Sequence, residues 1–284
     1  MDVLRIAAFS NGGTGGNPAG IVLLDAMPEA TQMQAVAAEV GFSETAFAAP
    51  SGEGWRVRYF SPESEVPFCG HATIALGAAL AMHAGEGIFS LELNNTAITV
   101  EGYRDGERFA AILQSPPTWS RPADPALVSE ALALFGFAQD DLDPRIPPAI
   151  AHGGATHLVL AFRERDHLTR MRYTLDAGRQ FMNAAGLVTI SLIHAETAQL
   201  FHARNAFASG GVYEDPATGA AAAALAGYLR DLGWPHHGQI EIVQGEDMGM
   251  KSLLKAEISP VTGSSIRISG AARRMSSGKG DHHG

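Results

Sequence analysis

The feature of this sequence that most constrains its fold is a set of short motifs that occur twice, in the same order. The repeated pairs are Ala72-Thr73-x-Ala75 with Ala217-Thr218-x-Ala220, Gly41-Phe42 with Gly186-Leu187, and Gly16 before Ile21-Val22-Leu23 with Gly154 before Leu158-Val159-Leu160. Single matches arise easily by chance in a chain rich in alanine and glycine. Several matches in one order are harder to dismiss, and they indicate an internal duplication.

The length of the chain permits two domains. With 284 residues and 46% hydrophobic content, it can bury one large core or two cores of about 120 to 150 residues each. The duplication favours two, and Ser115-Pro116-Pro117 ends the first half. We therefore predict an α/β (α+β) fold of two pseudo-repeated domains. The N-terminal half is expected to cover residues 1–116, joined by the segment 266–284, and the C-terminal half 117–265.

Composition and charge exclude several classes of function. No run approaches the roughly 20 apolar residues of a membrane span, and the N-terminus lacks a signal-peptide layout, so we expect a soluble, cytoplasmic protein without a membrane partner. The formal charge is −10. The basic residues are scattered, which argues against a nucleic-acid partner. The polar tail, residues 276–284, is expected to be disordered.

Cysteine and histidine give no sequence signal for a disulfide or a metal site. Cys69 is the only cysteine, so no disulfide can form within the chain. The pairs His236-His237 and His282-His283 lack a partner set with metal-ligand spacing. We read these histidines as solvated loop and tail residues and expect no metal.

Hydrophobic periodicity predicts a mixture of strands and helices. Strands are expected at 3–8, 21–24, 46–49, 56–60, 88–93, 97–101, 109–114, 156–162, 188–194, 239–244, 253–258 and 265–268, and helices at 28–40, 72–80, 127–135, 174–185 and 220–230. The glycine-dense stretch Asn11 to Pro18 lacks the third glycine and the opening helix of a dinucleotide-binding fingerprint. It is equally compatible with a loop that borders a ligand and with a long hairpin connection.

The stretch from Tyr59 to Leu80 combines a strand, a polar turn and the start of a helix. Cys69-Gly70-His71 falls at the N-terminus of that helix. Unpaired backbone N–H groups and the positive end of the helix dipole make such a terminus a site for a carboxylate. Gly219-Ala220 is expected to form a second terminus of this kind, so we predict that two helix N-termini hold the carboxylate of a small substrate.

Three titratable side chains lie beside these termini in the sequence. Glu44 stands between a helix end and a strand, His71 opens the first helix, and Asp215 precedes the second. A base and an acid that operate near neutral pH can move a proton between carbon atoms. A plain surface glutamate is the other interpretation of Glu44, because exposure is the usual fate of this residue.

Several motifs together resemble the phenazine-biosynthesis PhzF-like isomerase family. They lie in order between residues 16 and 245 and therefore cover most of the chain. The motifs are Gly16-Asn17-Pro18-Ala19, Gly41-Phe42-Ser43-Glu44-Thr45-Ala46-Phe47, Phe60-x-Pro62, Glu65-Val66, Cys69-Gly70-His71-Ala72-Thr73, Gly211-Val212-x-Glu214-Asp215-Pro216-Ala217-Thr218-Gly219 and Gln244-Gly245.

The resemblance implies a diaminopimelate-epimerase-like fold, in which each of two similar domains rolls a mixed sheet around a central helix. It also implies an active site between the domains, a homodimer and no cofactor. The position of Glu44 is the acid/base of the family, and those of His71 and Asp215 assist it. We expect the substrate to contact Asn17, Ser43, Cys69, Gly70, Thr73, Thr218, Gly219 and Ala220.

Related racemases use two opposed cysteines, and that arrangement is absent here. We therefore expect Cys69 to pack as a small buried hydrophobic residue.

Two departures from the family pattern bear on the substrate. Ala220 stands where serine is common, and Gly249-Met250-Lys251-Ser252 replaces a Gly-Arg-Pro-Ser ending, which exchanges a guanidinium for an ammonium group. The resulting hypothesis is a cofactor-independent isomerase of a small carboxylated molecule. The alternatives are an epimerase or racemase of a carboxylic or amino acid, and a ligand-binding protein that kept the site without turnover.

Overall fold

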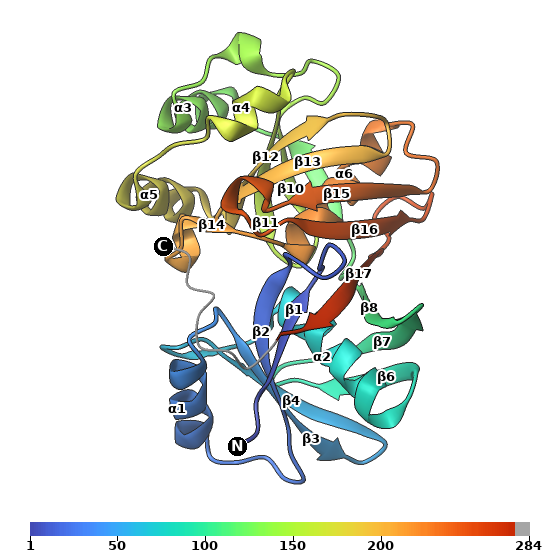
Figure 1. Cartoon of the computed structure of the whole chain (residues 1–284). Helices are drawn as coiled ribbons and strands as arrows, with labels where there is room; N and C mark the ends of the chain where they lie inside the picture. The colour runs from blue at the N-terminus through green and yellow to red at the C-terminus, as the bar shows by residue number, and fades with distance from the viewer. Residues whose placement is uncertain (276–284) are drawn as a thin grey trace. The chain divides into compact units, whose positions relative to one another are not determined.

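The computed structural model describes residues 1–275, so the prediction for the tail 276–284 lies outside the described residues. The chain divides into two compact units (Figure 1). Unit 1 contains Met1–Leu113 and, among the described residues, 270–275, and unit 2 contains Gln114–Ser269. The chain therefore leaves unit 1 once and returns to it within its last strand.

Unit 1 consists of a mixed sheet and two helices. Its elements are, in chain order, β1 (Leu4–Ala8), β2 (Asn17–Leu23), α1 (Ala30–Val40), β3 (Thr45–Ser51), β4 (Gly54–Phe60), β5 (Glu65–Val66), α2 (Gly70–Ala84), β6 (Gly87–Glu92), β7 (Ala97–Asp105) and β8 (Arg108–Gln114). β1 and β2 are antiparallel, so the glycine-dense stretch forms the connection of a hairpin, as one of its two interpretations predicts. The end of β17 pairs with β1 and completes the sheet.

Unit 2 contains the remaining elements. They are β9 (Trp119–Pro122), α3 (Pro125–Phe135), the 3₁₀ turn η1 (Gln139–Asp141), β10 (Ala149–His152), β11 (Thr156–Ala161), α4 (Arg165–Thr169), α5 (Leu175–Ala185), β12 (Thr189–Ala195), β13 (Leu200–Ala206), η2 (Ala208–Gly210), β14 (Glu214–Asp215), α6 (Gly219–Leu232), β15 (Gln239–Gln244), η3 (Glu246–Met248), β16 (Ser252–Ile258) and β17 (Ile266–Arg274). The first residues of β17 pair with β16 in this unit.

The two units repeat one order of strand pairing, which confirms the predicted duplication. In unit 1 an antiparallel pair, β1 and β2, is followed by β3 parallel to β2 and β4 antiparallel to β3. The strand after α2, β6, is again parallel to β4. In unit 2, β10 to β13 repeat the first three steps, and β15, which follows α6, is parallel to β13.

One predicted equivalence is wrong. The N-cap of α2 is Cys69 and that of α6 is Thr218, so the pair Ala72-Thr73 lies inside its helix whereas Ala217-Thr218 precedes its own. The reason is a longer connection before β14, which includes η2 and shifts the register of the repeat. The predicted match between Gly41 and Gly186 is confirmed, because Gly41 is the C-cap of α1 and Gly186 is the C-cap of α5.

A buried helix lies at the centre of each unit, as the predicted fold requires. α2 packs against β1, β2, β3, β6 and β7, and α6 packs against β9, β10, β11, β15 and β16. Figure 1 shows α2 in cyan with the strands of unit 1 around it. Both helices are rich in alanine and apolar around most of their circumference, the pattern of a helix with no solvent face.

Glycines on the facing strands bring the sheet close to these helices. A Cβ atom on Gly102 of β7 would lie 2.2 Å from the carbonyl oxygen of Gly77 in α2. In unit 2, a Cβ atom on Gly153, just after β10, would lie 2.5 Å from the backbone nitrogen of Ala224 in α6. Larger residues at either position would push the sheet off its central helix.

The outer helices cover the other face of each sheet with separate cores. In unit 1, Met33 and Ala37 of α1 pack with Val22, Phe47 and Phe60. In unit 2, α3 and α5 share a larger core with strands β10 to β13.

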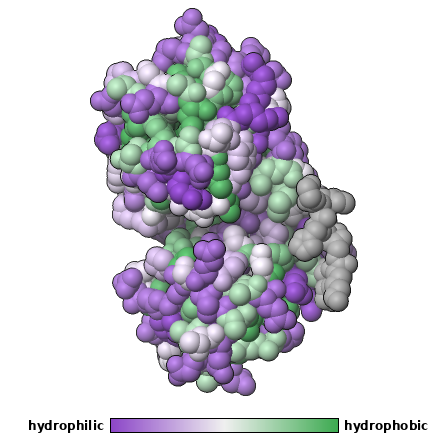
Figure 2. All heavy atoms as spheres, turned by 90° about the vertical axis from the view of Figure 1, so that its left-hand side faces the viewer, coloured by the Kyte–Doolittle hydropathy of each residue, from purple (hydrophilic) through white to green (hydrophobic). Residues whose placement is uncertain are grey.

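No helix among the described residues is both long and apolar enough to cross a membrane. On the face shown in Figure 2, apolar side chains are interspersed with hydrophilic ones.

Candidate active site

Glu44 is held at the edge of the sheet in unit 1. It follows the end of α1 and directly precedes β3, and its carbonyl oxygen accepts a 3.1 Å hydrogen bond from the backbone nitrogen of Gly20. The next residue, Thr45, is completely buried. The side chain of Glu44 is 18% exposed, so its backbone is fixed while its carboxylate still reaches solvent.

The start of α2 is fixed by a chain of hydroxyl groups. The Thr73 hydroxyl donates a 2.7 Å hydrogen bond to the carbonyl oxygen of Cys69, and the Tyr59 hydroxyl lies 2.7 Å from Thr73 Oγ1. Because the single hydroxyl proton of Thr73 is already used, Tyr59 must be the donor to Thr73. Burial raises the pKa of the Tyr59 phenol, which keeps this donor protonated.

His71 connects the thiol of Cys69 to the carboxylate of Glu44. Its Nδ1 atom lies 3.3 Å from Cys69 Sγ, and its Nε2 atom lies 3.5 Å from Glu44 Oε2 and 3.4 Å from Ser43 Oγ. The His71 side chain is only 7% exposed. A neutral imidazole can donate at one nitrogen and accept at the other, so this arrangement can pass a proton along the line from thiol to carboxylate.

The structure corrects the expectation for Cys69. Its side chain is half-buried and contacts an imidazole nitrogen instead of packing as a buried hydrophobic residue. The physical reason is its position, because an N-cap residue lies at the rim of a helix and not within its packed length. No side chain caps α2, so the first backbone N–H groups, at Gly70 and His71, keep the character of an anion site.

Unit 2 carries a second group of predicted residues, at the start of α6. Thr218 is the N-cap, and its hydroxyl donates a 2.6 Å hydrogen bond to Asp215 Oδ2. The Gln244 amide donates to the carbonyl oxygen of Asp215 at 2.6 Å and to Thr218 Oγ1 at 3.0 Å. Gln244 thus orients both residues, a role that its place in a sequence motif did not reveal.

Sequence reasoning missed one arginine–glutamate pair beside each helix start. Arg58 of β4 donates to both oxygens of Glu65 in β5, at 2.8 and 2.6 Å. Arg204 of β13 donates to both oxygens of Glu214 in β14, at 3.0 and 2.5 Å. Each pair ties the two-residue strand that precedes a central helix to the longer strand beside it.

The environments of these two pairs differ. The side chains of Arg204 and Glu214 are 6% and 3% exposed, and those of Arg58 and Glu65 are 20% and 27% exposed. The Arg58 guanidinium lowers the pKa of Glu65. The sequence signal for the pairs was the presence of Glu65 and Glu214 in motifs of the family resemblance.

The positions of the other predicted residues say less about their function. Asn17 is buried at the start of β2, and Gly219 and Ala220 open α6. The Lys251 ammonium, at one of the two departures from the family pattern, lies 2.9 Å from Glu246 Oε1. That lysine is therefore engaged by a neighbouring carboxylate.

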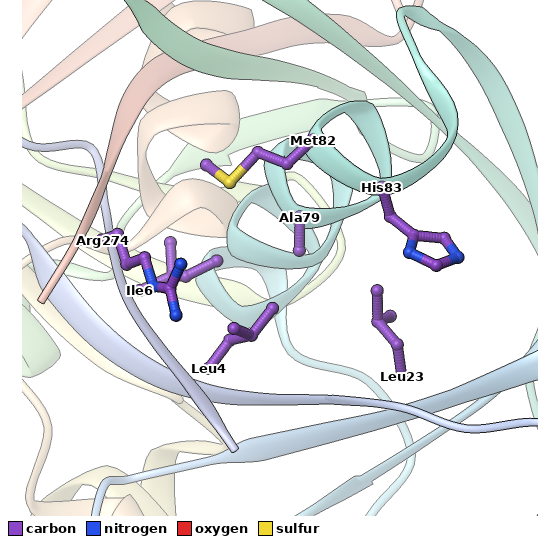
Figure 3. A pocket seen from close by; sticks show the side chains of 7 residues that line it. All are labelled: Leu4, Ile6, Leu23, Ala79, Met82, His83 and Arg274. Carbon is purple, nitrogen blue, oxygen red and sulfur yellow. The ribbon is translucent and has the colours of Figure 1, made fainter. Parts of the chain in front are cut away.

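A cavity of about 180 Å³ in unit 1 contains none of the predicted site residues (Figure 3). Leu4, Ile6, Leu23, Ala79 and Met82 make most of its lining apolar, and His83 and Arg274 supply the polar groups. It holds no pair of acid and base groups suited to proton transfer.

Comparison with known proteins identifies the family. Residues 6–278 match the family described as phenazine biosynthesis-like protein. The chain is 32% identical to an uncharacterized isomerase of Mesorhizobium japonicum, over 93% of each protein. It is 31% identical to the trans-2,3-dihydro-3-hydroxyanthranilate isomerase of Pseudomonas fluorescens, over 89% of this chain and 88% of that protein.

Solved structures agree on the fold. A phenazine biosynthesis protein of the PhzF family from Bacillus anthracis matches with a TM-score of 0.85 at 22% identity, over 97% of this chain and 98% of that one. A probable proline racemase from Agrobacterium radiobacter matches with a TM-score of 0.63 at 11% identity, over 96% of this chain and 90% of that one. The chain therefore belongs to the phenazine biosynthesis-like family of isomerases and has the diaminopimelate-epimerase-like fold.

Proposed function

We propose that this protein is a cofactor-independent isomerase that moves a proton between two carbons of a small carboxylated substrate, with Glu44 as the acid/base. The observation that carries the proposal is the pairing of a partly exposed Glu44 carboxylate with the buried imidazole of His71, 3.5 Å away. The backbone of Glu44 is held by the sheet, and that of His71 by its helix. A catalytic group that is positioned in this way needs little reorganisation during the reaction.

In the proposed reaction, Glu44 removes a proton from one carbon and the electron pair moves into the conjugated system of the substrate. The same carboxyl group then returns the proton to another carbon, so no atom is gained or lost. His71 donates from Nε2 to the carboxylate and orients it before the proton is taken and after it is returned. The backbone N–H groups at the start of α2 bind the substrate carboxylate.

The names of two relatives and the surroundings of Cys69 support the substrate class that we propose. Two curated relatives are named trans-2,3-dihydro-3-hydroxyanthranilate isomerases, and we take that cyclic carboxylic acid as the first candidate substrate. Phe68, which directly precedes Cys69, is 38% exposed and offers an apolar surface to a ring.

Asp215 and the start of α6 are proposed as assisting groups because of the family resemblance. The homodimer is proposed on the same ground.

The test is turnover in deuterated water, followed by mass spectrometry, with trans-2,3-dihydro-3-hydroxyanthranilate and a panel of small unsaturated carboxylic acids. Glu44→Gln keeps the shape of the side chain and removes its titration, so turnover is expected to fall by about a hundredfold or more. Glu39→Gln is the matched control, because Glu39 is exposed on α1. Product formation by Glu44→Gln at near-parental rates would assign the proton shuttle to another residue.

Epimerisation is a second candidate, and the contact between Cys69 Sγ and His71 Nδ1 favours it. A thiol beside an imidazole can exchange a proton at a stereocentre. The chain has one cysteine, so a two-thiol mechanism within one chain is excluded. Inversion of a chiral carboxylic acid without migration of a double bond would select this candidate.

A further inference from the structure

The cluster of Glu44, Cys69 and His71 combines three kinds of metal ligand. One donor atom from each of these side chains lies within 4.8 Å of the other two. We propose that the three residues form a binding site for Zn²⁺ or a similar thiophilic divalent cation, and that the bound metal inhibits the isomerase. The binding rests on the cluster alone, whereas the inhibition rests on the function proposed above.

The chemistry of the donors selects the metal. A thiolate, an imidazole and a carboxylate suit Zn²⁺, which accepts sulfur, nitrogen and oxygen ligands in one tetrahedron. Mg²⁺ and Ca²⁺ prefer oxygen ligands only, and a single carboxylate does not hold them. The negative charges of the Cys69 thiolate and the Glu44 carboxylate would balance the two positive charges of a divalent cation.

The donor atoms lie within 4.8 Å of one another, somewhat wider than the ligand spacing of a zinc site. Ligand atoms around a tetrahedral zinc are roughly 3.3 to 3.6 Å apart, as follows from bond lengths of about 2.0 to 2.3 Å. The Cys69 Sγ to His71 Nδ1 separation is 3.3 Å, and the His71 Nε2 to Glu44 Oε2 separation is 3.5 Å. These two contacts use different ring nitrogens, and a metal binds only one of them. A metal at Nδ1 keeps the thiol in place, and the Glu44 carboxylate must then turn toward it from within the 4.8 Å that separates the donor atoms.

The frame around the cluster limits the cost of that adjustment. Thr73 and Tyr59 fix the backbone of Cys69, and Gly20 fixes that of Glu44. For a metal at Nδ1, the group that has to move is the carboxylate of Glu44, whose side chain is partly exposed. With three protein ligands, the fourth position of the tetrahedron stays open to water, and this open position also gives the ion a path of entry.

Metal binding and proton transfer need the same carboxylate. A Glu44 carboxylate that is coordinated to Zn²⁺ is a much weaker base, because the cation draws charge from both of its oxygens. The His71 nitrogen bound to the metal is likewise removed from the hydrogen-bonded line. Occupation of this site therefore stops the proposed reaction without any change of fold.

Co²⁺ is the spectroscopic probe for the binding test, because a thiolate bound to it gives a charge-transfer band in the near ultraviolet. Cys69 is the only cysteine, so such a band reports this site alone. We expect the full-length protein to show the band with one equivalent of Co²⁺. Zn²⁺ should abolish the band by displacement, and Mg²⁺ should leave it unchanged.

Three variants complete the binding test, each checked for folding by its thermal transition. Cys69→Ser should remove the band and weaken Zn²⁺ binding at least about tenfold, equivalent to about 1.4 kcal/mol. Glu44→Gln should keep the band but lower the affinity. The double change His282→Ala with His283→Ala should leave the band intact. Absence of the band in the parent, or equal Zn²⁺ affinity in the parent and Cys69→Ser, would overturn the proposed site.

The inhibition is measured separately. Zn²⁺ at a concentration that saturates the site should suppress turnover, and a chelator should restore it. Full turnover with the metal bound would overturn the inhibition while leaving the isomerase function in place. Conversely, near-parental turnover by Glu44→Gln would refute the proposed function, and the Co²⁺ band would still report whether the metal site exists.

Discussion

Arg204 donates two hydrogen bonds to Glu214, from Nε at 3.0 Å and from Nη2 at 2.5 Å, in an environment where both side chains are almost fully buried. A third bond, from Nη1 to the carbonyl oxygen of Leu168, uses the remaining face of the guanidinium. Glu214 directly precedes Asp215 in β14. The pair therefore sets the position of the backbone that carries a predicted catalytic carboxylate.

Removal of one charge from this pair should be strongly destabilising. We expect Glu214→Gln to lower the free energy of unfolding by about 3 kcal/mol, because the buried Arg204 charge loses its near partner and keeps only Asp247, whose Oδ2 lies 4.0 Å away. The matched change Glu65→Gln, in the more exposed pair of unit 1, should lower it by about 1 kcal/mol or less. Urea unfolding of both variants measures the difference. Equal losses would show that burial does not distinguish the two pairs.

Loss of the Tyr59 hydroxyl should loosen the start of α2. Tyr59→Phe removes the donor to Thr73 Oγ1 at a fully buried position. The free energy of unfolding should fall by about 1 to 2 kcal/mol. A double-mutant cycle with Thr73→Val tests the cause, because the two effects should not add if the hydroxyls act on each other. Additive losses would assign the effect to packing alone.

His157 should make stability depend on pH. Its side chain is fully buried in β11 with Nδ1 2.8 Å from Thr189 Oγ1, and burial lowers its pKa to about 3. In the unfolded state the pKa is about 6.5, so the unfolded chain takes up the proton first as the pH falls. Stability from the neutral imidazole is complete above about pH 6.5 and is lost progressively toward pH 3.

The measurement is the unfolding free energy of the parent and of His157→Gln at pH 7.5 and pH 4.5. The parent should lose about 2 to 3 kcal/mol more than the variant between these two values. The carboxylates that titrate in the same range contribute equally to both proteins and cancel. His237→Gln, at an exposed position, should behave as the parent does. An identical pH dependence in the parent and His157→Gln would contradict a buried neutral His157.

Cys69→Ser separates the roles of the thiol and the carboxylate. If Glu44 shuttles the proton, this variant should lose less than about a hundredfold in turnover, equivalent to about 2.7 kcal/mol of barrier. A serine hydroxyl can still hydrogen-bond to His71 Nδ1 but does not ionise near neutral pH. A larger loss in a folded variant would place the thiol at the centre of the chemistry and support the epimerase alternative.

Much of the fold was predictable because its signals are local. The glycine at the end of α1, the apolar periodicity of α2 and the alanine-rich α6 identify the helices, and alternating residues identify most strands. β13 was missed because Leu200–Ala206 contains histidine, arginine and asparagine on a strand that the structure largely buries. β5 and β14 have only two residues each, too few for any periodicity.

The sequence predicted which residues form the candidate site, but it did not predict the distances between them. The sequence motifs contain Glu44, His71 and Cys69. The structure brings these three residues together in unit 1. The ion pairs beside the two sites were missed because arginine and glutamate are surface residues by default. Only the pairing of β13 with β14 places Glu214 opposite Ala206 and within reach of Arg204.

The sequence by itself determined the duplicated α/β pattern, the two central helices and the residue types of the site, because these depend on periodicity and on residues close together in the chain. Tertiary structure alone decided that His71 lies between a thiol and a carboxylate, that Arg204 is buried with Glu214, and that the pKa of His157 is far below normal. Distances and burial arise from contacts between segments far apart in the chain. Local propensities carry no information about those contacts.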